Sequence, residues 1–123
     1  MNFLLVMAGG AIGSLARYSV GIGAGRWLGP NYPWGTLAVN LIGGFLMGLL
    51  AGTLARMGGS EPTRALIGVG VLGGFTTFSA FSLDAVTMIE RGDWGVAITY
   101  ALVSVIGSVV ALFGGLYLVR AVG

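Results

Sequence analysis

The chain has 123 residues, of which 56% are hydrophobic and only 8% are charged. A soluble domain carries about 25% charged residues, so this composition excludes an ordinary soluble protein and indicates an integral membrane protein. Cysteine and histidine are absent, which excludes disulfides, thiolate metal sites and histidine catalysis. The formal net charge is +2, but the sequence has no basic cluster, so we expect no nucleic-acid partner.

Four apolar segments follow one another along the chain. A membrane-spanning helix needs about 20 apolar residues, so the length suffices for four crossings and little else. We therefore predict an all-α membrane protein with a single transmembrane domain over residues 1–123 in contact with the lipid bilayer. The predicted helices cover residues 2–25, 35–55, 63–90 and 94–119. Residues 26–34 are expected to form a loop, because proline and glycine interrupt them and aromatic residues suit the boundary between lipid and water.

The third predicted helix contains an unusual stretch, Gly73-Gly74-Phe75-Thr76-Thr77-Phe78-Ser79-Ala80-Phe81-Ser82. A membrane helix would normally carry leucine and valine at this point. We expect the helix to break near residues 73–77, because glycine permits irregular backbone and hydroxyl groups can replace lost backbone hydrogen bonds. Irregular backbone survives in a membrane only beside protein or a water-filled cavity. A helix broken at the membrane midplane is therefore predicted to form an ion or substrate site.

The arginines give no preferred orientation in the membrane. With four crossings, both termini lie on one side, together with Arg56, Arg64 and Arg120. The other side has an equal number, namely Arg17, Arg26 and Arg91. Because the positive-inside rule cannot decide between the two orientations, we predict dual topology and an antiparallel homodimer. A single orientation set by another factor is the alternative.

Neutral polar side chains recur every four residues in two of the predicted helices. The second helix has Thr36 and Asn40, and the fourth has Tyr100, Ser104 and Ser108. Residues four apart share one face of a helix. Each set therefore forms a ladder of neutral donors that suits a small anion or water. The alternative is hydrogen bonding between helices, worth less than about 1 kcal/mol for each bond.

Three phenylalanines recur every three residues, at Phe75, Phe78 and Phe81. Packing is the ordinary explanation of this spacing, although the positive edge of a phenyl ring can also face an anion. Two charged residues, Arg17 and Asp84, lie in the predicted helices towards the membrane boundary. Charges at this depth pair or reach the interface. We predict that these two neutralise one another or cap nearby backbone, which is a structural role.

Three stretches, in order along the chain, closely resemble the signatures of the Fluc (CrcB) fluoride channels. They are Gly9-Gly10-Ala11-Ile12-Gly13-Ser14-Leu15-Ala16-Arg17-Tyr18, Gly35-Thr36-Leu37-Ala38-Val39-Asn40-Leu41-Ile42-Gly43-Gly44-Phe45 and the stretch Gly73–Ser82. The resemblance covers essentially the whole chain. It implies a multi-pass protein of the cell inner membrane, working as a dual-topology antiparallel homodimer. It also implies passive, selective export of cytoplasmic fluoride, which confers fluoride resistance.

The same resemblance implies a set of pore residues. The family's pore phenylalanines map onto Phe78 and Phe81, and its pore asparagine maps onto Asn40. The remaining pathway residues that we expect are Tyr100, Ser104, Ser108, Thr77 and Ser79. The resemblance further implies a structural sodium ion at the dimer centre. Backbone carbonyls of Gly73 and Thr76 from both subunits would hold it.

Two other functions compete with a channel. A small proton-coupled multidrug-type exporter needs a carboxylate embedded in the membrane. The first two predicted helices have none, and the third has only Asp84 and Glu90 towards one end. A non-transporting assembly subunit, whose glycines simply pack, would conduct no ion. An enzyme is not expected, because no nucleophile–base pair or metal cluster can be assembled without histidine or cysteine.

Overall fold

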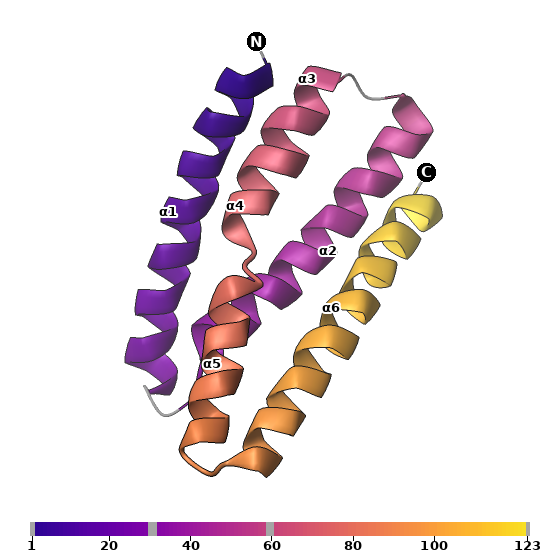
Figure 1. Ribbon diagram of the computed structural model, residues 1–123. Coiled ribbons are helices and arrows are strands. Elements are labelled where there is room, and N and C mark those ends of the chain that lie inside the picture. The colour runs from indigo at the N-terminus through magenta and orange to yellow at the C-terminus, as the bar shows by residue number, and fades with distance from the viewer. Residues whose placement is uncertain (1, 30–31, 59–60, 123) are drawn as a thin grey trace.

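The computed structural model describes residues 2–29, 32–58 and 61–122, and helices make up nearly all of them (Figure 1). Three helices are long: α1 (Asn2–Leu28), α2 (Trp34–Met57) and α6 (Trp94–Val122). Between α2 and α6 lie four shorter elements, namely α3 (Glu61–Thr63), η1 (Arg64–Leu72), α4 (Gly73–Phe75) and α5 (Ser79–Glu90).

Among the described residues, four stretches are long and apolar enough to cross a membrane, and they cover residues 2–28, 34–57, 61–90 and 94–122. This result confirms the prediction of an all-α protein with four helices able to span a bilayer. In each stretch, at most 28% of the residues in an apolar run of 18 residues are buried inside the chain. Most large apolar side chains therefore face outwards, as expected of surfaces that contact lipid or another protein.

The first helix is longer than the sequence predicted, so the start of the predicted loop is helical. Residues 26–28 belong to α1, which ends at Leu28 and is followed by Gly29. There the backbone adopts a positive φ of 88°, which favours glycine, and its N–H donates to the carbonyl of Gly25 at 3.1 Å. Pro30 and Asn31 of the predicted loop lie outside the described residues.

The third membrane segment contains two departures from a regular α-helix. The element η1 is π-helical over nine residues, a rare conformation in which backbone bonds join residues five apart. Residues 76–78, which we call the α4–α5 linker, are not helical, and Thr76 has an extended backbone with φ −82° and ψ 159°. The linker is visible in Figure 1 as the narrow connection between α4 and α5.

The glycine pair predicted to break this segment is itself helical. Gly73 and Gly74 belong to α4, and the non-helical residues follow them. A side chain at Gly74 would lie 2.7 Å from the carbonyl oxygen of Gly10 in α1. The two glycines allow α4 to approach α1 closely, and the chain leaves the helix at Thr76, towards the end of the range 73–77 in which we predicted the break.

The helices pack in two pairs, which Figure 1 shows side by side. The most extensive contact joins α2 to α6, and the next joins α1 to η1. Glycine permits the α2–α6 approach, because a Cβ atom on Gly115 would lie 2.7 Å from the backbone nitrogen of Leu49. A small buried cluster lies where α2, α5 and α6 meet, and its members are Leu37, Met88, Ala97 and Tyr100.

Candidate functional site

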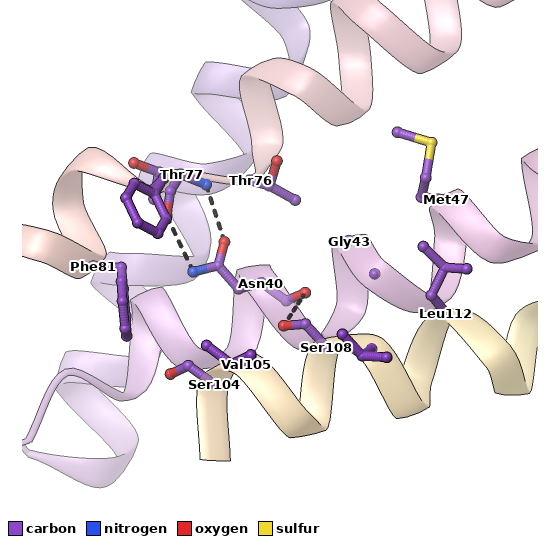
Figure 2. Close-up of a pocket in the computed structure, with 13 residues that line it drawn as sticks. Asn40, Gly43, Met47, Thr76, Thr77, Phe81, Ser104, Val105, Ser108 and Leu112 are labelled. Carbon is purple, nitrogen blue, oxygen red and sulfur yellow. Dashed lines mark hydrogen bonds between the residues drawn. The ribbon is translucent and has the colours of Figure 1, made fainter. Parts of the chain in front are cut away.

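A cavity of about 430 Å³ lies between α2, the α4–α5 linker and α6. We call it the α2–α6 groove, and Figure 2 shows the residues that line it. Part of its lining is glycine and apolar side chains, and no charged residue is among the described residues that form it. Its polar and aromatic lining consists of Asn40, Thr76, Thr77, Phe78, Phe81, Ser104 and Ser108.

Asn40 on α2 pairs with the backbone of Thr77 in the linker through two hydrogen bonds. Its Oδ1 accepts from the Thr77 N–H at 3.0 Å, and its Nδ2 donates to the Thr77 carbonyl at 3.1 Å. Figure 2 shows both bonds as dashed lines. The side-chain amide thus supplies the donor and the acceptor that a peptide group would supply in a regular helix. Asn40 therefore fixes the linker against α2.

These bonds redirect the donors that a continuous α-helix would use. In such a helix the N–H of Thr77 would donate to the carbonyl of Gly73, and the N–H of Ala80 to that of Thr76. Here the Thr77 N–H bonds to Asn40, and the Ala80 N–H bonds to the Thr77 hydroxyl at 3.1 Å. The carbonyl oxygens of Gly73 and Thr76 therefore lose their usual helical donors. Such oxygens are hard, neutral ligands of the kind that alkali and alkaline-earth cations bind.

Other residues of the predicted stretch also contribute to the linker. The Thr76 hydroxyl donates to the carbonyl of Leu72 at 3.0 Å. The hydroxyl oxygens of Thr77 and Ser79 are 3.4 Å apart, and Ser79 is exposed and does not line the groove. The linker is thus held from within by hydroxyl groups, as the composition of the stretch had suggested, and from outside by Asn40.

Two serines of α6 face the groove in different hydrogen-bonding states. The Ser108 hydroxyl donates to the backbone carbonyl of Asn40 at 3.3 Å. Ser104 is only 5% exposed, and within the described part of the chain its hydroxyl has no hydrogen-bond partner. An unpaired buried hydroxyl costs free energy of about 1–3 kcal/mol unless a ligand or water bonds to it. Ser104 is therefore a groove-lining residue whose buried hydroxyl has unused hydrogen-bonding capacity within the described residues.

The two predicted pore phenylalanines lie together in the groove, and the predicted tyrosine lies behind them. The ring centres of Phe78 and Phe81 are 5.6 Å apart, and Phe78 is 77% exposed. Tyr100 is fully buried and does not line the groove. Its ring lies 5.2 Å from that of Phe81, and its hydroxyl donates to the carboxylate of Asp84 at 3.1 Å. Phe75, to which we assigned no pore role, is buried.

Arg17 and Asp84 have separate hydrogen-bond partners. Arg17 donates its Nε to the carbonyl of Gly74 at 3.3 Å, whereas Asp84 accepts from Tyr100. The arginine thus provides a hydrogen-bond donor for a backbone carbonyl next to the linker. The two residues also line different cavities, of about 290 Å³ for Arg17 and about 260 Å³ for Asp84, and Thr36 lines both. Thr36 and Asn40, which were predicted to form one ladder, therefore line different cavities.

Sequence reasoning missed two features near the groove. Its apolar half is lined by Met47, Val105, Val109 and Leu112, whose pattern does not differ from that of lipid-facing residues. It also missed Tyr32, which packs edge-on against the ring of Tyr100 with centres 5.6 Å apart. Burial raises the pKa of the Tyr32 phenol above its ordinary value. Its place in an expected loop gave no sign of this contact.

Comparison with known proteins adds independent information. A family model described as "CrcB-like protein, Camphor Resistance (CrcB)" matches residues 4–116. A protein of Phenylobacterium zucineum named "Fluoride-specific ion channel FluC" is 60% identical over 121 residues, which cover 97% of this chain and 95% of that protein. A protein with the same name from Mesorhizobium japonicum is 56% identical, and the match covers 97% of this chain and 96% of that protein. Another from Caulobacter vibrioides is also 56% identical, and the match covers 98% of this chain and 97% of that protein.

Proposed function

We propose that this chain, which belongs to the CrcB-like protein family, is a fluoride-selective ion channel that conducts passively. It is a channel and not an enzyme, as its relatives' names indicate. Passive conduction moves cytoplasmic fluoride outwards whenever its electrochemical gradient points that way, which would confer fluoride resistance. The observation that carries the proposal is the unpaired, buried hydroxyl of Ser104 in a groove with no charged residue in its described lining.

The chemistry of the groove suits a small anion that must also leave again. Conduction requires binding that is strong enough to replace water and weak enough to release the ion. A carboxylate in the groove would repel fluoride, and a desolvated arginine would bind it too tightly. The neutral hydroxyl of Ser104 and the edges of the Phe78 and Phe81 rings provide interactions of intermediate strength. The residues that we assign to the pathway are Asn40, Thr77, Phe78, Phe81, Ser104 and Ser108, which line the groove. Ser79 and Tyr100, which we had also expected there, lie outside its lining.

The two competing functions fit these observations less well. A proton-coupled exporter would need a carboxylate in its transport site, but Asp84 lines a separate, smaller cavity and accepts a hydrogen bond from Tyr100. A non-transporting assembly subunit would have no reason to bury the Ser104 hydroxyl without a partner. Both remain distinguishable from a channel by ion flux.

We further propose that two copies assemble antiparallel, with dual topology in the cell inner membrane, and that the α4–α5 linker lies at the membrane midplane. Support comes from the equal numbers of arginines on the two sides and from the outward-facing apolar surface of the single chain. Phe78 lines the groove and yet is 77% exposed, so a second copy would be needed to close the pathway. Unsealed, the groove would open to lipid.

A structural sodium ion at the dimer centre is part of the proposal. Carbonyl oxygens of Gly73 and Thr76 would hold it, since Asn40 and the Thr77 hydroxyl divert their helical donors. The residues fit a hard cation: Gly73 is exposed, and no cluster of three acidic, histidine or cysteine side chains within residues 2–29, 32–58 and 61–122 competes for it. When bound, sodium would supply positive potential near the groove.

Ion flux from liposomes that contain only the purified protein tests the main proposal. A fluoride electrode should record rapid fluoride efflux, and a chloride electrode should record none, without any proton gradient. Absence of both fluxes would favour the assembly subunit. Flux that appeared only with a proton gradient would favour the exporter. Both results would refute a passive fluoride channel.

The assembly and the cation need separate measurements. A cysteine placed at Gly123 should be labelled from both sides of the membrane if the topology is dual, and from one side only if it is not. The purified protein should be more resistant to heating in sodium chloride than in N-methylglucamine chloride. Equal resistance in both salts would contradict a bound sodium ion.

A further inference from the structure

We propose that Tyr32, between α1 and α2, is a positioning residue that sets the orientation of the groove phenylalanine Phe81 by acting through Tyr100. This inference rests on the proposed channel function. Tyr32 does not line the α2–α6 groove, and it lies in a segment expected from sequence to be a boundary loop. Its influence on conduction would therefore be indirect.

The basis is a continuous series of aromatic contacts from the α1–α2 connection to the groove. The ring of Tyr32 lies 4.6 Å from that of Trp34 and 5.6 Å from that of Tyr100, which it meets at an interplanar angle of 84°. Tyr100 in turn lies 5.2 Å from Phe81, and Phe81 lies 5.6 Å from Phe78. Aromatic pairs at these separations have preferred orientations, so each ring restricts the next one.

Tyr100 is suited to pass this restriction on. Its side chain is fully buried, and its hydroxyl is fixed on Asp84, so only the flanks of the ring remain to be held. Phe81 contacts the ring on the groove side, and Tyr32 meets it edge to face. Without Tyr32, a space would open beside Tyr100, and buried side chains next to such a space gain alternative orientations. Phe81 would then lose its fixed neighbour.

Simple packing is the competing explanation, because Tyr32 also contacts the buried cluster of Leu37, Met88, Ala97 and Tyr100. A residue that only packs would change the amount of folded protein, and each folded molecule would conduct normally. A positioning residue would change conduction by folded protein. The ring and not the hydroxyl carries the observed contact, so phenylalanine should replace tyrosine at this position.

The experiment compares the wild type with Tyr32→Leu, Tyr32→Phe and Trp27→Leu, each purified and reconstituted at equal protein density. Fluoride efflux and the ratio of fluoride to chloride flux are measured. Trp27 is the matched control, since it is a boundary aromatic at the end of α1 that is 89% exposed. We expect Tyr32→Leu to reduce fluoride efflux about threefold to tenfold or to lower the flux ratio, since an aromatic pair contributes roughly that factor. Tyr32→Phe and Trp27→Leu should match the wild type.

Each other outcome has a defined meaning. Wild-type flux by folded Tyr32→Leu would overturn the positioning role and leave the proposed channel intact. An equal loss in Tyr32→Phe would overturn it as well, because the hydroxyl would then be responsible. If Tyr32→Leu aggregates, Tyr32→Met takes its place, and aggregation of both would show a purely structural residue. Absence of fluoride flux in the wild type would instead refute the channel itself.

Discussion

Replacing Asn40 with aspartate should nearly abolish fluoride conduction. The substitution keeps the size of the side chain and the acceptor for the Thr77 N–H, but it removes the donor to the Thr77 carbonyl. An unpaired carbonyl costs about 1–3 kcal/mol. The new negative charge has the larger effect on the ion. A fluoride ion about 4 Å from a carboxylate is repelled by about 4 kcal/mol at an effective dielectric constant near 20. Since 1.4 kcal/mol is a factor of ten, occupancy should fall about a thousandfold.

The assay is fluoride efflux from liposomes, with protein density matched by size-exclusion chromatography of the purified variant. Asn2→Asp is the control, because it makes the same chemical change at an exposed position near the start of α1. We expect that control to conduct like the wild type. If folded Asn40→Asp conducted at the wild-type rate, Asn40 could not lie beside the ion, and our assignment of the α2–α6 groove as the pathway would fail.

Three further substitutions test other parts of the structure. Ser104→Ala should lower fluoride efflux about tenfold or more, because it removes a donor to a charged ligand, whereas Ser19→Ala, on an exposed face, should leave efflux unchanged. Arg17→Ala should lower the free energy of unfolding by about 1.5 kcal/mol, because the hydrogen bond to the Gly74 carbonyl is lost. The ratio of fluoride to chloride flux should stay unaltered, and a stable variant without selectivity would contradict this expectation. Gly115→Ala should lower the aggregation temperature by overpacking α2 against α6, whereas Gly114→Ala, with its nearest neighbour 3.9 Å away, should not.

The four-helix fold could be predicted because hydropathy and length determine where a chain crosses a membrane. Irregularities within the third segment were harder to predict. The sequence predicted a break near residues 73–77, partly because glycine permits irregular backbone, but the same residue type also permits close helix packing. Only the position of Gly10 on a neighbouring helix distinguishes the two uses. The π-helical form of η1 likewise has no signal in residue spacing.

The polar part of the groove could be anticipated from four-residue spacing, but the spacing did not determine which of the spaced residues line the groove. Ser104 and Ser108 line the groove, whereas Tyr100, one turn earlier on the same face of α6, does not. The difference arises from α5 and from the α1–α2 connection, because Phe81 and Tyr32 surround the Tyr100 ring and close it off. These contacts join residues far apart in sequence, so a helical period cannot predict them.

The groove imposes two requirements on Asn40 that only a neutral amide of this length meets together. At the linker, the side chain must accept from one backbone group and donate to another, which a carboxylate or an ammonium group cannot do. In the groove, it must add no net charge beside an anion, since a full charge would either repel or trap the ion. The group that compensates for the interrupted helix is thus also compatible with permeation. The proposed pathway therefore needs no histidine, no cysteine and no charged residue in the described lining of the groove, because one neutral side chain both supports the irregular backbone and borders the pathway.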